Sequence, residues 1–253
     1  MLLEAKHINK RFGGLQALKD VSLSIPTNTI YGVIGPNGAG KTTLFNVLTG
    51  LYQADSGELL FKNHHLLNAP THKIVKRGIA RTFQNIRLFS NMTVLENVMV
   101  GCHVRTHASA LGAILRDGST QREEHYIRER SQQLLQYVGI DRHAEKLSTH
   151  LSYGDQRRLE IARALATQPT LLALDEPAAG MNPTETSTLR NLLLKIKKDG
   201  ISILLIEHDV RLIMGLCDRV AVLDYGELIA EGDPENIQRD VRVIEAYLGG
   251  APL

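Results

Sequence analysis

The sequence predicts an α/β fold, with a mostly parallel sheet covered by helices and a helical block inserted into it. Short apolar runs alternate with helix-forming segments at both ends of the chain, which is typical of a parallel sheet. From about Asn85 to Gln168 there is little strand pattern. With 253 residues, 43% of them hydrophobic, the chain can bury a substantial core. We expect a single domain over residues 1–253, its core formed by 1–84 and 169–253 and a helical subdomain by 85–168.

The first third of the chain is expected to form strands and two short helices. Gly50 and Gly78 end these helices, because glycine readily adopts the backbone conformation that closes a helix. The expected elements are short strands on either side of a turn at Gly13-Gly14, a buried strand at Ile30–Gly35, a helix at Lys41–Thr49, a strand at Gly57–Phe61, a helix at Thr71–Lys76 and a strand at Ala80–Phe83.

The middle of the chain is predicted to be helical, and strands return after Pro169. Thr93 can cap a helix that runs to about Val100, whereas residues 103–119 are loosely patterned and expected to be irregular or partly helical. The other expected elements are a charged amphipathic helix at Gln121–Tyr137, strands at Leu171–Asp175, Ile201–Ile206, Arg219–Asp224 and Glu227–Gly232, helices at Thr184–Lys198 and Asp209–Leu216, and a short C-terminal helical stretch.

Composition excludes several classes of function. The formal net charge is +2, without a basic tail or patch, so we expect no nucleic-acid partner. Cys102 and Cys217 are far apart and lack metal-ligand spacing, which favours two free thiols in a reducing compartment. We do not expect the charged N-terminus to be a signal peptide, and no apolar run approaches the ~20 residues that span a bilayer. At a membrane, another chain would have to hold this one.

The segment GPNGAGKT, Gly35 to Thr42, matches the phosphate-loop pattern G-x-x-x-x-G-K-[ST] at every fixed position. It follows an expected strand and precedes an expected helix, which is the context this loop requires. The glycines allow a tight turn whose N–H groups point at phosphate oxygens. Lys41 places a positive charge near the β and γ phosphates, and the Thr42 hydroxyl is a suitable ligand for Mg²⁺.

A second candidate site is LLALDEP, Leu171 to Pro177, where a buried strand ends in two carboxylates. By itself such a pair is more commonly a charge pair at a helix N-terminus. Beside a phosphate loop, however, Asp175 can bind Mg²⁺ directly or through water, and Glu176 can deprotonate a water that attacks the γ phosphate.

The order of the phosphate loop, LSYGDQ, LLALDEP and a histidine after a strand resembles the ATP-binding cassette of ABC ATPases over nearly the whole chain. The resemblance implies a P-loop NTPase cassette with a parallel core, an antiparallel β subdomain and an inserted helical subdomain. It also implies that Phe12 stacks on adenine, that Gln84 contacts Mg²⁺ and senses the γ phosphate, and that His208 contacts the γ phosphate.

The residues expected to act together follow from these motifs and the resemblance. The catalytic set is Glu176, His208, Lys41 and Gln84, and the Mg²⁺ set is Thr42, Gln84 and Asp175. The residues expected to bind ATP are Phe12, Gly35, Pro36, Asn37, Gly38, Ala39, Gly40, Lys41, Thr42, Thr43, Ser152 and Gly154.

The serine–glycine turn, residues 152–154, implies a second chain. In ABC cassettes two chains pair head to tail, and each such turn closes over the ATP of the other; Ser152 and Gly154 resemble those contacts. Tyr153 and Asp155 depart from the family's LSGGQ pattern, and Asn182 stands where the family usually has Asp. We expect Asp155 to point away from the phosphate, because it would otherwise repel it.

The segments RTFQNIRLFSNMTVLENVMVG and EPAAGMNPTET resemble the ATP-binding subunits of prokaryotic branched-chain amino-acid importers. The resemblance implies a second cassette, identical or different, two membrane permeases, an external binding protein and a peripheral place on the cytoplasmic face of the inner membrane. Ile86, Leu88, Phe89 and Met92 could line the groove that receives a permease helix, or could be ordinary core residues.

Three alternatives compete with this interpretation. The chain could be the ATPase subunit of another ABC transporter, for urea or amide import or for lipopolysaccharide export. The chain could be a soluble ABC ATPase of DNA repair or translation, but its single phosphate loop and lack of sustained heptads argue against this. It could bind nucleotide while scarcely hydrolysing it, but Glu176 and His208 are both present.

Overall fold

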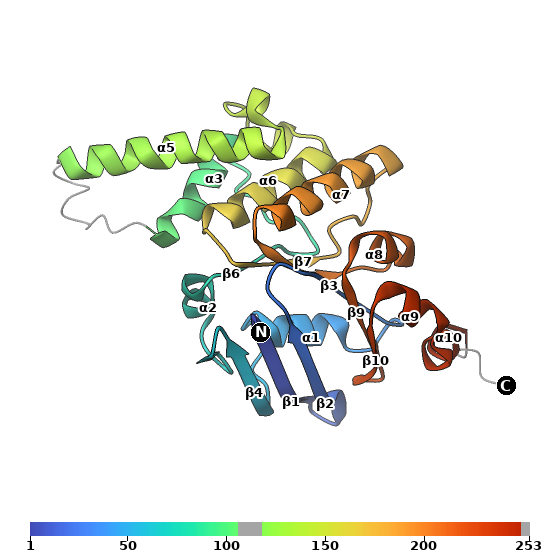
Figure 1. The fold of residues 1–253 in the computed structure, drawn as a ribbon. Coiled ribbons are helices and arrows are strands. Elements are labelled where there is room, and N and C mark those ends of the chain that lie inside the picture. Colours follow the sequence, from blue (N-terminus) through green and yellow to red (C-terminus); the bar gives the residue numbers. More distant parts are fainter. Residues whose placement is uncertain (106–117, 249–253) are drawn as a thin grey trace.

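The computed structural model describes residues 1–105 and 118–248 and arranges their strands in two sheets (Figure 1). The antiparallel sheet has the order β2-β1-β4-β5 and the larger one the order β10-β9-β3-β8-β7-β6. The strands are β1 Leu3–Phe12, β2 Leu15–Ile25, β3 Ile30–Ile34, β4 Ser56–Phe61, β5 His64–His65, β6 Ile79–Arg81, β7 Leu171–Asp175, β8 Ser202–Ile206, β9 Arg219–Asp224 and β10 Glu227–Gly232.

Helices cover the larger sheet on both sides. Short 3₁₀ turns occur at residues 103–105, 141–143 and 148–150. The helices are α1 Lys41–Leu48, α2 Thr71–Arg77, α3 Val94–Cys102, α5 Gly118–Val138, α6 Tyr153–Ala166, α7 Pro183–Lys198, α8 Val210–Leu216, α9 Pro234–Arg239 and α10 Val241–Leu248.

The larger sheet is parallel except at β10, which pairs antiparallel with β9. Strands covered on both faces need apolar side chains at every position, which explains the unbroken apolar runs of β3, β7 and β8. Along β3, Ile30 and Ile34 belong to one hydrophobic core, and Tyr31 and Val33 belong to the other. The alternation follows from the two-residue period of a strand.

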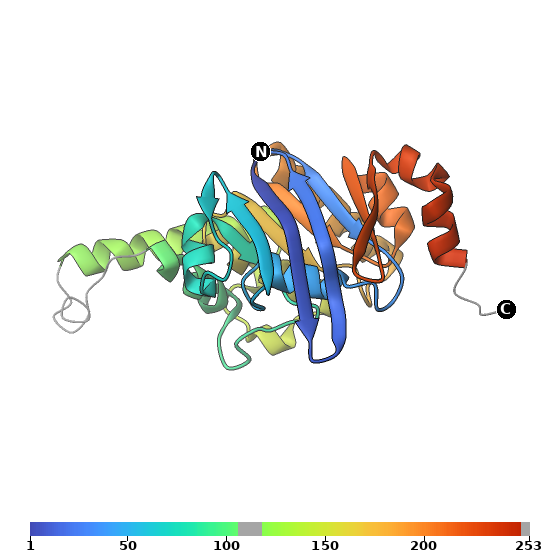
Figure 2. The same cartoon turned by 90° about the horizontal axis from the view of Figure 1, so that it is seen from below.

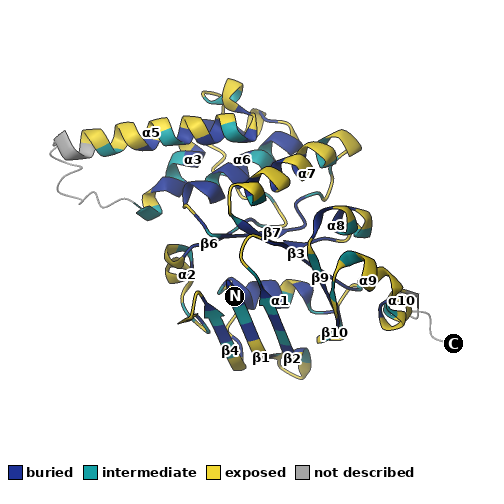
Figure 3. Ribbon diagram, in the orientation of Figure 1, coloured by how far each residue is buried: buried dark blue, intermediate teal, exposed yellow. Residues whose placement is uncertain are grey.

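The two cores lie on opposite faces of this sheet. One contains α1 and the antiparallel sheet, and the other contains residues of α3, α5, α6, α7 and α8 (Figures 1 and 3). Viewed from below, α5 and α10 lie at opposite sides of the molecule (Figure 2). Among the described residues, the structure contains no helix that is both long and apolar enough to cross a bilayer.

Parallel pairing brings the ends of distant segments together. Arg81 pairs with Ala173, Asp175 with Ile206, and Ile206 with Val33, so the loops after β6, β7, β8 and β3 leave the same edge of the sheet. Ligands bind at this edge of open α/β sheets.

The expected elements agree with the structure, with a few differences in bounds. The strand expected at Ala80–Phe83 ends at Arg81, because the backbone at Phe83 turns away to hydrogen bond with α6. The charged helix extends to residues 118–138. The short strand β5 was not expected, and of the loosely patterned stretch residues 106–117 lie outside the described residues.

Candidate active site

The phosphate loop joins β3 to α1 and leaves the start of α1 without a side-chain cap. Free N–H groups at a helix start favour a bound anion. The Lys41 Nζ donates hydrogen bonds to the carbonyl oxygens of Gly35 and Pro36, both at 2.8 Å. Burial lowers the pKa of Lys41, and the nearby charge of Glu176 opposes that shift.

Two glycines of this loop are required by close backbone approaches. A Cβ atom on Gly35 would lie 2.0 Å from the carbonyl oxygen of Leu223, and one on Gly40 would lie 2.6 Å from that of Ala17. Gly40 also has a φ of 99°, in the left-handed region that favours glycine. The glycines therefore fit the loop against the strands that flank it.

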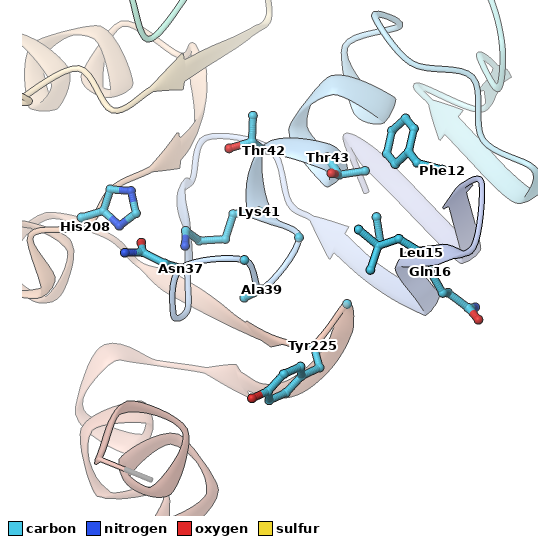
Figure 4. Close-up of a pocket in the computed structure, with 14 residues that line it drawn as sticks. Phe12, Leu15, Gln16, Asn37, Ala39, Lys41, Thr42, Thr43, His208 and Tyr225 are labelled. Atoms are coloured by element: carbon cyan, nitrogen blue, oxygen red, sulfur yellow. The ribbon is translucent and has the colours of Figure 1, made fainter. Parts of the chain in front are cut away.

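A cavity of about 440 Å³ lies beside the loop (Figure 4). Phe12 and His208 lie on opposite sides of it, with Lys41 between them. The Phe12 ring packs edge-on against Tyr52, with 5.3 Å between the ring centroids. Residues 37–43, which were also predicted from the sequence to belong to the site, line this cavity as well.

Several residues that line this cavity were not predicted from the sequence. They are Leu15, Gln16, Ala17, Tyr225 and Gly226. Gly226 belongs to the β9–β10 turn, yet its N–H donates to the Ala39 carbonyl and its carbonyl accepts from the N–H of Lys19. In the sequence, the pair Tyr225-Gly226 indicates only a turn between two strands and does not indicate that this turn lines the cavity.

Glu176 lies at the edge where the parallel strands end and is held by two side chains. Its Oε1 is 2.5 Å from the Nε2 of His208, and its Oε2 accepts a hydrogen bond from the Nε2 of Gln84 at 2.8 Å. The three residues follow β7, β8 and β6, so the sheet topology brings them together. Glu176 has a φ of 47°, an uncommon conformation that its loop imposes.

Asp175 is 3% exposed at the end of β7. Its Oδ2 is 3.8 Å from the Nη2 of Arg81, and its Oδ1 has no hydrogen-bond partner among the described residues. Burial raises the pKa of Asp175, and Arg81 opposes that shift. An orphaned carboxylate oxygen fits a hard cation such as Mg²⁺. The described residues contain no group of three or more His, Cys, Asp or Glu side chains that could hold a metal unaided.

Ser152 and Gly154 do not line the phosphate-loop cavity. They line a separate cavity of about 200 Å³ between α6 and α7. The Ser152 Oγ caps α6 by accepting the N–H of Asp155 at 3.2 Å. A Cβ on Gly154 would lie 2.8 Å from the Oε1 of Glu185, so glycine permits the close approach of α7.

The three departures from the family pattern contact their own chain. The Tyr153 ring lies beside Gly180 and its hydroxyl accepts from Arg157 at 3.3 Å. The carboxylate of Asp155 contacts Arg158 and lies 3.7 Å from the Nε2 of His143. Asn182 caps α7, accepting the N–H groups of residues 184 and 185 at 3.0 Å each.

A second large cavity, of about 620 Å³, forms a groove between α2, β6, α3 and α6. Leu88 and Phe89 line this groove, which agrees with one of the two alternatives that the sequence left open. Ile86 and Met92 do not line it. The segment after β6 is irregular, so no periodicity indicated which of its apolar residues face the groove.

Comparison with known proteins gives the family. Residues 18–179 match the family described as ABC transporter, and residues 227–252 match one described as branched-chain amino acid ATP-binding cassette transporter. The chain is 44% identical to the high-affinity branched-chain amino acid transport ATP-binding protein LivG of Escherichia coli K12, over 99% of this chain and 98% of that protein. It is 34% identical to the lipopolysaccharide export system ATP-binding protein LptB of Haemophilus influenzae, over 98% and 97%.

Solved structures show the same fold. The ADP conformation of an ATP-binding cassette of an ABC transporter superimposes with a TM-score of 0.85, at 34% identity and 98% coverage of each chain. A dimeric cassette bound to ADP and phosphate gives a TM-score of 0.77 at 26% identity, covering 92% of this chain and 98% of that one. The chain belongs to the ABC transporter family of ATP-binding cassettes.

Proposed function

We propose that this chain is the ATP-hydrolysing subunit that powers a membrane importer of branched-chain amino acids, through ATP-driven closure of a cassette pair. The observation that carries the proposal is Glu176, held by Gln84 and His208 at the edge where the phosphate loop begins. The identity to LivG, with the match of residues 227–252, supports the cargo. The lower identity to LptB makes lipopolysaccharide export the weaker alternative.

Nucleotide binding uses the groups that line the cavity. Phe12 stacks on adenine, while backbone N–H groups among residues 37–43 and the Lys41 ammonium bind phosphate oxygens. Lys41 exchanges the two carbonyls that it now contacts for those oxygens. Thr42, Gln84 and Asp175 would hold Mg²⁺, which, when bound, would offset the charge of the phosphates.

Hydrolysis uses Glu176 as the general base. The carboxylate takes a proton from a water while the water oxygen bonds to the γ phosphorus and the bond to the β–γ bridging oxygen breaks. ADP and phosphate leave, and the proton passes to solvent. Gln84 and His208 orient the carboxylate, and Lys41 stabilises the charge on the transferred group.

A second cassette completes each site. Because Ser152 and Gly154 lie outside the phosphate-loop cavity of their own chain, we infer that they bind the γ phosphate held by a partner cassette. The start of α6 favours that anion, because the positive end of the helix dipole lies there. The dimeric structural relative supports this pairing, and the second chain can be identical or different.

Two membrane permeases hold the pair at the cytoplasmic face of the inner membrane of a prokaryotic cell, and an external binding protein delivers the cargo to them. The groove lined by Leu88 and Phe89 receives a permease helix. Phe89 is exposed although large and apolar, as a docking contact would be in the free subunit. We expect no nucleic-acid partner.

Co-purification tests this proposal. The tagged chain is expressed in its native host, the membranes are solubilised gently, and the bound proteins are identified by mass spectrometry. Two permeases and a second cassette are expected, and leucine, rather than urea, on the binding protein should stimulate ATP hydrolysis by the reconstituted complex. Recovery only from the soluble fraction, with nucleic acid or ribosomes, would overturn the transport function.

A further inference from the structure

Charged side chains on helix α6 form hydrogen bonds with the backbone of residues 83–87. The Arg157 Nη1 donates to the carbonyl of Phe83 at 2.6 Å, and its Nη2 donates to the carbonyl of Gln84 at 2.8 Å. The Oε1 of Glu160 accepts the N–H of Phe83 at 3.2 Å. Three backbone groups at two consecutive residues are thus bound by one face of α6.

Arg163 extends the same face by one more turn and donates to the carbonyl of Arg87. Positions 157, 160 and 163 are spaced by three residues, which places them along one side of a helix. We call Arg157, Glu160 and Arg163 the backbone clamp.

The clamp is more costly than packing requires. Arg157 is fully buried and Glu160 is 1% exposed, and their side chains pair at 2.8 Å. Burying two charges carries a large desolvation penalty, so a buried ion pair is a poor means of stabilising a core. The Nε of Arg157 is also buried without a hydrogen-bond partner among the described residues. Aliphatic side chains could fill this space, but they would leave the Phe83 N–H and the carbonyls of Phe83 and Gln84 without these partners.

The clamp connects two functional regions of one chain. At the start of α6, Ser152 caps the helix, and the Tyr153 hydroxyl accepts from Arg157 at 3.3 Å. At the other end, Gln84 donates its side-chain amide to Glu176. An unbroken series of contacts therefore runs from the serine–glycine turn through Arg157 and Gln84 to Glu176.

We propose that Arg157 is a positioning residue that couples the two ATP sites of the cassette pair. It makes Gln84 move with α6, so that engagement of the serine–glycine turn by the partner's ATP sets the position of Gln84 against Glu176 in this chain. The inference rests on the proposed function, because it needs two cassettes that share their sites.

The test is Arg157→Lys, which keeps a positive charge beside Glu160 but cannot bond two carbonyls with one planar fork. Arg105→Lys is the matched control, because Arg105, like Arg157, donates to backbone carbonyls. Its three acceptors are those of Thr167, Lys76 and Gln168, and none of them lies in residues 83–87. We expect Arg157→Lys to lower kcat about tenfold or more with the KM for ATP within about twofold, and the control to change neither by more than about twofold.

Hydrogen exchange gives a readout that a structural role would not move. In a Glu176→Gln background, ATP is expected to slow amide exchange in residues 151–158 and 82–89. With Arg157→Lys added, protection of 151–158 should remain while protection of 82–89 is lost. Protection of both segments in the Arg157 variant would overturn the coupling. A parallel fall in Tm, kcat and ATP affinity would also overturn it, because that marks a purely structural role.

If the Arg157→Lys variant does not fold, Tyr153→Phe is the variant to use in its place, since this change removes only the hydroxyl that Arg157 contacts. We expect a two- to fivefold lower kcat, at an unchanged KM for ATP and an unchanged Tm. An unchanged kcat contradicts the coupling. If the unaltered chain shows neither ATP hydrolysis nor any ATP-dependent protection, the proposed function itself fails, and the coupling fails with it.

Discussion

Replacing His208 by alanine tests whether this histidine acts through Glu176. The contact between its Nε2 and the Oε1 of Glu176 is 2.5 Å, while Gln84 holds the other oxygen. A hydrogen bond to a charged group contributes about 1.5–3 kcal/mol. Because the His208 side chain is 48% exposed, water can replace part of the contact, and the lower value applies. A loss of ~1.5 kcal/mol corresponds to roughly a tenfold lower kcat.

The assay measures phosphate release at saturating Mg-ATP in His208→Ala, in Glu176→Gln and in the double variant. Loss of a general base lowers the rate by about 10²–10⁴-fold. If His208 acts by orienting Glu176, it has nothing left to orient in the Glu176→Gln background, and its removal there should change the residual rate less than about twofold. His64→Ala, which alters an exposed histidine on β5, serves as the control and should leave every rate unchanged.

An equal, roughly tenfold loss in both backgrounds would refute this reasoning, because His208 would then act on the substrate independently of Glu176. An unchanged kcat in the single variant would refute it as well.

Three further predictions concern Lys41, Asp175 and Asp155. Lys41→Ala should weaken ATP binding about 10- to 100-fold in a fluorescent-nucleotide titration, because the ammonium can no longer bind phosphate, and unchanged affinity would contradict this role. Activity should fall on the acid side as Asp175, whose pKa burial raises, takes up a proton, and on the alkaline side as Lys41, whose pKa burial lowers, loses one. The ordinary pKa values of Asp and Lys are about 3.9 and 10.4, so the plot of kcat/KM against pH should have a plateau narrower than this interval. Activity that falls only at these two ordinary pKa values would contradict the prediction. Asp155→Gln should change kcat less than about threefold, since the carboxylate contacts Arg158 and His143 of its own chain, whereas a tenfold loss would show a role at the phosphate.

Local patterns were enough to place the loop of residues 35–42 between a strand and a helix, because its eight residues are consecutive in the chain. Gln84 and His208 were assigned from the resemblance to ABC cassettes, and the parallel pairing of β6, β7 and β8 places both beside Glu176 at one edge of the sheet. The structure adds the geometry of that pairing, and the roles of these residues stay predictions.

Contacts between distant segments could not be predicted in this way. Tyr225 and Gly226 reach the cavity only because β9 lies beside β3, nearly two hundred residues earlier in the chain. Arg157 lies in a charged helical stretch that is typical of a solvated surface, and its burial depends on the loop packed against it. The division of the chain into a core and a helical subdomain over 85–168 stays a prediction.

In the proposed cycle, ATP joins two cassettes and hydrolysis separates them. Size-exclusion chromatography with light scattering tests it on Glu176→Gln, alone or mixed with any second cassette that the co-purification experiment recovers. We predict an assembly of two cassettes in saturating Mg-ATP and single cassettes in Mg-ADP. A Glu176→Gln chain that binds ATP yet stays monomeric in both samples would contradict the shared-site mechanism.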